Sequence, residues 1–406
     1  MQYPSAVVAA LEAALAELSA QFALGQFTEV LAQLPPLFEG VDGLEDSPCK
    51  RDLQLRLLFI RARCHSKFDR FGDTLQDCAE MLNLRALDEG SRQRAELMEL
   101  ISYCHVNLSM PEQALRAAQV TLQDGLLLRD PLLCSQGLER SAMAYLCMGD
   151  ALEAERFMIE SLGFVEQQGL GYERLRRYSN AIHLLCALHD NYLSAGNQRM
   201  AQGVLERGQR LLPLGDALAS GEPSEFIRLM WHANMGRWKR RQGRLSAAQE
   251  QLASVLASPS TRQWHGLRRS MQLELALIAE ASDRLDDALA LLQALFEPQS
   301  LRVRDVEALG AMAAQLRVLI LLQRPAEAER VSQALAQRRN ERMQAARQAH
   351  QQLQGVRQRI ISALAQADRQ RVEHEIHRLR GLRHQSAALQ PSPEAQAWIS
   401  EQDMAG

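Results

Sequence analysis

The chain has 406 residues, of which 47% are hydrophobic and 5% aromatic, and its formal net charge at pH 7 is −3. Abundant Ala, Leu, Gln, Glu and Arg, with few aromatic or β-branched runs, favour an all-α protein. The small net charge excludes a general attraction to nucleic acid or anionic membranes. Only three of the 46 basic residues are lysines, a preference typical of a bacterium with a GC-rich genome.

The N-terminal residues and the cysteines bear on the cellular compartment. Glu12 and Glu17 interrupt an apolar run that no basic region precedes, so we expect neither a signal peptide nor a membrane span. Seven cysteines without a Cys-x-x-Cys pair are typical of buried thiols in a reducing environment. A cytoplasmic protein is therefore the simplest expectation.

Residues 1–90 predict two irregular helical hairpins. The first is expected to turn at Gly25, and its second helix to end near the pair Pro35-Pro36, because proline removes a helical hydrogen bond. A loop over 39–48 should follow, and the second hairpin should turn near Asp69.

Residues 91–324 predict the regular part of the fold. An alanine recurs five residues after the start of each of six predicted turns, at intervals of 40 or 47 residues. This period, made of two helical patterns, indicates a solenoid of helix hairpins, in which a small residue lets two antiparallel helices approach closely. Val30 and Thr74 take the same place in the first two hairpins. The six alanines are Ala114, Ala154, Ala201, Ala248, Ala288 and Ala328.

Small residues and tyrosines stand at fixed distances before these alanines. Tyr145 and Tyr192 lie nine residues before one, and four small residues lie 12 before one, namely Ser102, Ala142, Gly236 and Ala276. The placement resembles the tetratricopeptide repeat, whereas HEAT repeats share only the period.

Repeats of 40–47 residues, rather than about 34, resemble the longer units of MalT-like, Rap-like and cyclase-linked sensory regulators of bacteria. The resemblance implies an all-α, right-handed superhelical solenoid of about eight hairpins. Its concave face is expected to bind a ligand or a protein.

Residues 325–385 predict that the last hairpin continues into one long basic helix, and 386–406 a disordered tail. Twelve arginines and six acidic residues give 325–384 a net charge of +6. This helix could cap the solenoid, pair with a second copy of the chain or bind an acidic partner, because it carries an apolar stripe with coiled-coil-like spacing. The stripe comprises Leu353, Val356, Ile360, Leu364, Val372, Ile376 and Leu379.

The inner faces of the first helices of the hairpins predict a partner-binding groove. Mixed polar residues with methionine and tyrosine suit a peptide or a partner helix, although every solenoid has a solvated face of this kind. The predicted lining, counted back from each alanine, is Glu96, Glu99, Tyr103, Gln136, Glu139, Met143, His183, Asp190, Met230, Arg237, Arg240, Glu280 and Arg317.

A dense basic cluster lies beside Trp238. Arginine beside tryptophan suits a carboxylate or a phosphate, so an acidic protein or peptide is favoured as partner, and nucleic acid is disfavoured because no recognition motif accompanies the cluster. The alternative is that these cations stabilise the last turn of a helix through its dipole. The cluster is Arg237, Lys239, Arg240, Arg241 and Arg244.

The segment His377-Arg378-Leu379-Arg380-Gly381 is similar to the phosphotransfer pattern His-x-Leu-Lys-Gly. A phosphorelay role for His377 is therefore one alternative function, although the sequence lacks the remaining helices of such a bundle. His374 and His377, with His384, form a weaker metal-binding pattern because a third ligand is not fixed by the helix.

No nucleotide-binding, hydrolase, metalloprotease or cyclase motif occurs, so we expect no cofactor, no metal and no enzymatic activity. The sequence predicts a cytoplasmic bacterial scaffold or regulator that binds a protein or peptide in its groove. The alternative is a sensory module without an output domain that responds to a small ligand or peptide.

Overall fold

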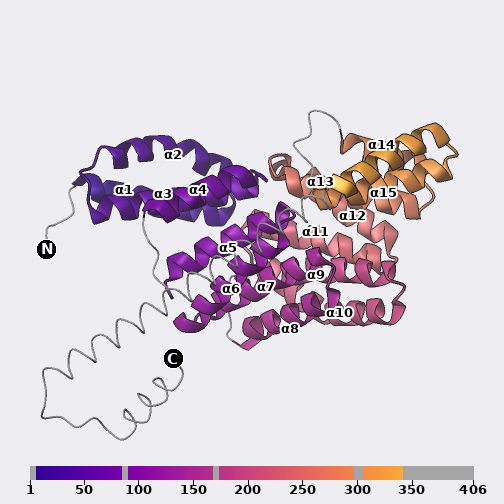
Figure 1. The fold of residues 1–406 in the computed structure, drawn as a ribbon, viewed down its shortest axis with the longest axis horizontal. Coiled ribbons are helices and arrows are strands. Elements are labelled where there is room, and N and C mark those ends of the chain that lie inside the picture. Colours follow the sequence, from indigo (N-terminus) through magenta and orange to yellow (C-terminus); the bar gives the residue numbers. More distant parts are fainter. Residues whose placement is uncertain (1–5, 85–89, 168–172, 297–304, 342–406) are drawn as a thin grey trace, which may run out of the picture. The chain divides into compact units, whose positions relative to one another are not determined.

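The computed structural model in Figure 1 describes residues 6–84, 90–167, 173–296 and 305–341, and within them every regular element is helical. A further helix spans 325–341. The others, in chain order, are α1 (Ala6–Leu24), α2 (Phe27–Asp42), α3 (Pro48–Lys67), α4 (Phe71–Leu84), α5 (Arg92–Asn107), α6 (Pro111–Leu128), α7 (Pro131–Met148), α8 (Ala151–Gln167), α9 (Glu173–Ser194), α10 (Gln198–Ala219), α11 (Glu225–Arg241), α12 (Leu245–Ala257), the short η1 (Pro259–Arg262), α13 (His265–Ala281), α14 (Leu285–Ala294) and α15 (Asp305–Leu321).

Consecutive helices pair as hairpins, from α1 with α2 to α13 with α14, and α15 packs against the helix over 325–341. The first helices of neighbouring hairpins also contact one another in an unbroken series from α1 to α15. The described residues therefore form a solenoid of eight hairpins, which confirms the predicted all-α fold class.

One turn geometry joins the two helices of all eight hairpins. At Gly149 the backbone is left-handed, with φ of 88°, and the next N–H, of Asp150, donates to the carbonyl of Tyr145 at 3.0 Å. This is the Schellman arrangement, which satisfies carbonyls at the end of the first helix. The aligned residue, Ala154, follows five residues after Gly149 and is fully buried. The equivalent left-handed residues are Gly25, Asp69, Ser109, Gly149, Gly196, Gly243, Asp283 and Gln323.

The predicted close approach at the aligned positions is confirmed. The hydroxyl of Ser102 donates to the carbonyl of Ala114 across the hairpin at 2.7 Å. A Cβ atom added to Gly236 would lie 2.6 Å from Cγ of Leu252, so that position has no room for a larger residue. The small residues therefore set the distance between the two helices of a hairpin.

One predicted helix end is wrong. α2 continues through Pro35-Pro36 to Asp42, because its apolar face extends to the fully buried Val41. Elsewhere, α6 continues through Gly125, where a Cβ atom would lie 2.8 Å from the backbone nitrogen of Cys134, so this glycine permits the close approach of α7.

The first two hairpins pack against the sixth and seventh, about 200 residues later in the chain. The ring of Phe226 lies 5.3 Å from that of Phe27 and 4.8 Å from that of Trp264. At the turn of the second hairpin, Asp69 accepts from Arg269 of α13 at 2.6 Å. These contacts enclose the inner side of the third, fourth and fifth hairpins.

Among the described residues, α1 is long and apolar enough to cross a membrane by length and composition, which the sequence analysis did not expect. Core helices of globular proteins and signal sequences near an N-terminus pass the same test, and 17% of the apolar window of α1 is buried. Leu11, Leu15 and Leu18 of α1 are buried in one core with residues of α2 and α3. In this structure α1 therefore serves as part of the hairpin core.

Candidate functional site

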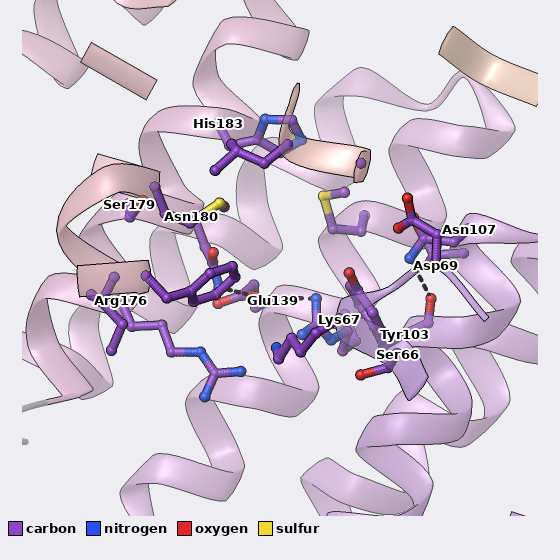
Figure 2. A pocket seen from close by; sticks show the side chains of 18 of the residues that line it. Ser66, Lys67, Asp69, Tyr103, Asn107, Glu139, Arg176, Ser179, Asn180 and His183 are labelled. Carbon is purple, nitrogen blue, oxygen red and sulfur yellow. Dashed lines mark hydrogen bonds and ion pairs between the residues drawn. The ribbon is translucent and has the colours of Figure 1, made fainter. Parts of the chain in front are cut away.

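A cavity of about 200 Å³ lies where the first helices of six consecutive hairpins meet (Figure 2). Residues of α3, α5, α7, α9, α11 and α13 line it, because stacked hairpins present their first helices to one side. The contact of the second hairpin with α13 closes the series of helices around the cavity.

Eight of the residues predicted for the groove line this cavity. Counting back from the aligned alanines therefore identified its face on α5, α7, α9 and α11. The eight residues are Glu99, Tyr103, Gln136, Glu139, Met143, His183, Met230 and Arg237.

The other five predicted groove residues are not among those that line the cavity. Glu96 accepts from an arginine one turn earlier on α5. Glu280 of α13 and Arg317 of α15 form an ion pair with both hydrogen bonds at 2.8 Å. Asp190 and Arg240 belong to a separate group of charges beside the cavity.

Several lining residues were missed by the sequence analysis, above all Arg63 and Lys67 of α3 and Arg176 of α9. The first 90 residues were treated as irregular, so no lining was assigned there. A signal was present, because the count of 11 residues back from Thr74 reaches Arg63. On α9, a helix of 22 residues, the first position counted was His183. Arg176 lies two turns before His183 and was therefore not counted.

Glu99 is bound from the neighbouring hairpin. Its carboxylate accepts from Nε of Arg140 at 2.7 Å. Burial raises the pKa of Glu99, but the positive charges of Arg140 and Arg176 outweigh this and hold the pKa at about 2. Glu99 is therefore an ionised, hydrogen-bonded group and not a proton donor at neutral pH.

Glu139 is held in the same way. It accepts from Arg177 at 2.7 Å and from the side-chain amide of Asn180 at 2.8 Å, and Arg140 lies 3.3 Å from it. Arg177 is only 2% exposed. These bonds tie α7 to α9 at the wall of the cavity.

Arg237 crosses from α11 towards two neighbouring helices. It donates to Asn234 on its own helix at 2.6 Å and to Ser270 of α13, and it lies 3.0 Å from Nδ1 of His183. Since Arg237 is 5% exposed, its side chain forms part of the cavity wall.

Arg63 and Lys67 have a different environment, because aromatic rings lie next to their charges. The guanidinium of Arg63 lies 4.7 Å from the ring centre of Phe22, and the ammonium of Lys67 lies 5.5 Å from that of Phe226. Burial, followed by the charges of Arg176 and Arg63, holds the pKa of Lys67 well below its usual range. In the described part of the chain, neither cation has an acidic group within ion-pair distance.

The predicted basic cluster is not one surface, because successive residues on a helix point in different directions. Arg237 lines the cavity, and Lys239 donates to Gln251 of α12 at 2.7 Å. Arg244 is exposed at the start of α12. Two sequence neighbours, Arg240 and Arg241, are buried or half-buried in ion pairs.

These ion pairs form what we call the α11 network, made of Arg240, Arg241, Asp190 and Glu274. Arg241 lies 3.1 Å from Glu274 of α13 and also binds Asp190 of α9, while Arg240 binds the same two carboxylates. Burial raises the pKa of Asp190, but a hydrogen bond from His189 and the two arginines bring it to about 2. The network therefore joins three first helices with two cations and two anions.

No set of three or more metal-ligating side chains occurs in residues 6–84, 90–167, 173–296 and 305–341. The candidate His377, its neighbours His374 and His384, and the stripe from Leu353 to Leu379 all lie outside these ranges. Burial raises the pKa of the Cys64 and Cys104 thiols to about 12, which makes them unreactive at neutral pH.

Comparison with known proteins shows the fold. No family model and no curated protein matches the chain. A solved Rap protein complexed with competence and sporulation factor is 11% identical, with a TM-score of 0.54, over 82% of this chain and 99% of its own.

Two further solved structures are less similar. The apo form of RapI is 11% identical, with a TM-score of 0.49, over 69% of this chain and 94% of its own. Aspartyl phosphate phosphatase F from Bacillus subtilis is 12% identical, with a TM-score of 0.32, over 88% of this chain and 95% of its own. The fold shared with the Rap protein of TM-score 0.54 is a solenoid of helix hairpins, as the repeat pattern predicted.

Proposed function

We propose that this protein is a regulator or scaffold that binds a peptide, or an extended segment of a protein partner, with one or two side chains of the ligand inside the cavity. The observation that carries the proposal is the convergence of six first helices on one partly open, mixed polar and apolar site. A solenoid collects residues from many repeats along one inner face, which is suited to an extended ligand.

The lining supports a peptide as ligand. Met143, Met230 and Trp264 offer apolar contact, and Gln136 and Asn180 offer amide groups for a peptide backbone. A volume of about 200 Å³ admits one or two side chains and not a folded domain. The similar Rap protein was solved with competence and sporulation factor, which agrees with ligand binding by this fold.

A binding role also fits the state of the cavity acids better than a catalytic role. Glu99 and Glu139 are each bound by an arginine at 2.7 Å, and the pKa of Glu99 is about 2. A general acid or base at neutral pH has a pKa near the working pH and access to a substrate proton. Glu99, with its pKa of about 2, does not meet this description.

The test is selection of displayed random heptapeptides on the immobilised full-length protein. Gln136 lies on α7, half-buried at the cavity, so a Gln136→Trp variant would fill part of it. Gln202 is exposed on α10, so Gln202→Trp adds the same ring away from the cavity. We expect peptides enriched by the wild type to lose at least about tenfold in affinity with Gln136→Trp, a loss of about 1.4 kcal/mol, and to bind Gln202→Trp normally.

Equal binding to wild type and Gln136→Trp, with both proteins folded by circular dichroism, would place the peptide elsewhere and contradict the proposal. Failure to enrich any peptide would also contradict it, and would favour the small-ligand sensory module as the function.

A further inference from the structure

The cavity carries more positive than negative charge. Five cationic and three acidic side chains line it, an excess of two positive charges. We infer that Arg63 and Lys67 of α3 and Arg176 of α9 form a subsite for an oxyanion of the bound peptide, either a carboxylate or a phosphoryl group. This oxyanion subsite rests on the proposed function, since it names the chemistry of the ligand that the cavity takes.

The acids of the cavity are already engaged elsewhere. Glu99 and Glu139 accept from Arg140 and Arg177 respectively, both at 2.7 Å. Asp69 accepts from an arginine of α13 at 2.6 Å. None of these three carboxylates forms an ion pair with a cation of the oxyanion subsite among the described residues.

Only one cation of the subsite, Arg176, has a carboxylate within ion-pair distance among the described residues. Arg176 lies 3.7 Å from Glu173, one turn earlier on α9, and the same carboxylate lies 3.6 Å from Arg177. Arg63 and Lys67 contact aromatic rings, at 4.7 and 5.5 Å from the ring centres. Aromatic faces attract cations but do not neutralise them.

The positions of these side chains allow them to bind one oxyanion together. Arg63 and Lys67 are four residues apart, so they lie on one face of α3. In Figure 2, the side chain of Arg176 extends from α9 into the pocket, toward Lys67. An arginine guanidinium can donate two parallel hydrogen bonds to a carboxylate or phosphate, and the lysine ammonium adds a compact charge.

Without a bound oxyanion, the surroundings of Arg63 and Lys67 disfavour their charged forms. Desolvation and the charge of Arg176 lower the pKa of both Lys67 and Arg63. An oxyanion between these groups would offset the repulsion and supply the missing acceptor.

Three pools of fluorescein-labelled heptapeptides, random at the flanking positions, would test the inference by fluorescence anisotropy at one fixed ionic strength. The first has a central Asn or Gln and an amidated C-terminus. The second has a central Asp or Glu and a free C-terminal carboxylate, and the third a central phosphoserine and an amidated C-terminus. The stronger of the last two identifies the oxyanion as carboxylate or phosphoryl.

We expect the wild type to bind the second or third pool at least about tenfold more tightly than the first. Lys67→Met, which keeps the length of the side chain, should remove most of this preference and still bind the first pool. Lys239→Met is the matched control, because Lys239 bonds Gln251 outside the cavity, and it should keep the preference. Arg176→Gln is the second test variant and should act as Lys67→Met does.

Equal affinity for all three pools would overturn the oxyanion subsite and leave the proposed function intact, provided that Gln136→Trp still weakens binding. An equal loss of preference in Lys67→Met and Lys239→Met would overturn it as well, since the effect would then be one of overall charge. Absence of binding by every pool would overturn the proposed function and the subsite together.

Discussion

Two groups of charged side chains in this protein differ in their charge balance. In the α11 network, two arginines meet two carboxylates from α9 and α13. In the oxyanion subsite, only Arg176 of the three cations lies near a carboxylate, that of Glu173 at 3.7 Å, and Glu173 also lies 3.6 Å from Arg177. Both groups lie on first helices of the hairpins, so fold position alone does not distinguish them.

On our proposal, the difference separates a structural role, in the α11 network, from a binding role, in the oxyanion subsite. A balanced group satisfies its own charges and ties three helices together. A group with excess charge disfavours the free protein and leaves hydrogen-bond donors for a ligand. The comparison predicts that removing a charge has opposite effects on stability in the two groups.

The largest effect is expected for Glu274→Gln, which removes one carboxylate from the α11 network. Glu274 is 7% exposed and binds both Arg240 and Arg241. Removing one partner of a buried ion pair leaves uncompensated charge and costs about 3–5 kcal/mol. Urea unfolding followed by circular dichroism should show this loss. A loss below about 1 kcal/mol would mean that the network is not a structural element.

The hairpin solenoid was predictable because its determinants are local. A left-handed residue and a small residue five positions later recur at every hairpin turn, and each is fixed by the backbone geometry of that turn. In the first two hairpins, Val30 and Thr74 occupy the position of the aligned alanine, and both are fully buried although they are larger than alanine. The cavity face on α5 to α11 followed from the same count.

The charge pairing was not predictable from local pattern. Arg241 looked like part of a basic surface because its sequence neighbours are basic, but its partners Asp190 and Glu274 lie 51 and 33 residues away. The contact of the first two hairpins with α13 depends on how rotations add up over several repeats, which no single repeat encodes. For that reason Arg63 and Lys67 were not assigned to the site.

A smaller effect of opposite sign is expected for Lys67→Met in the oxyanion subsite. The variant removes a half-buried cation without an acidic partner, so the free protein should gain about 1 kcal/mol at neutral pH. Thermal or urea unfolding without added peptide would measure it. A loss of stability would show that Lys67 contributes to the fold and would weaken the contrast between the two groups.

The pH dependence of this gain sharpens the comparison. The pKa of Lys67 is lowered in the folded state from a usual value of 10.5. At pH values below the folded-state pKa the amine is charged in both states, and its penalty is full. As the pH rises from there towards 10.5, the folded protein releases the proton first, so the wild type gains stability relative to Lys67→Met. If the difference in unfolding free energy between wild type and Lys67→Met stays constant over this range, the pKa of Lys67 is not lowered in the folded state.

The smallest effect is expected for Glu280→Gln, six residues after Glu274 on α13. Glu280 also binds an arginine of the next first helix, but that partner, Arg317, is 54% exposed. Water screens such a pair, so its loss should cost less than about 1 kcal/mol, and less still at high salt. The two variants make the same chemical change on the same helix. The difference between their losses of unfolding free energy in urea therefore reports the effect of burial and of the number of partners. If Glu280→Gln were as destabilising as Glu274→Gln, charge balance in the buried network would not explain its stability.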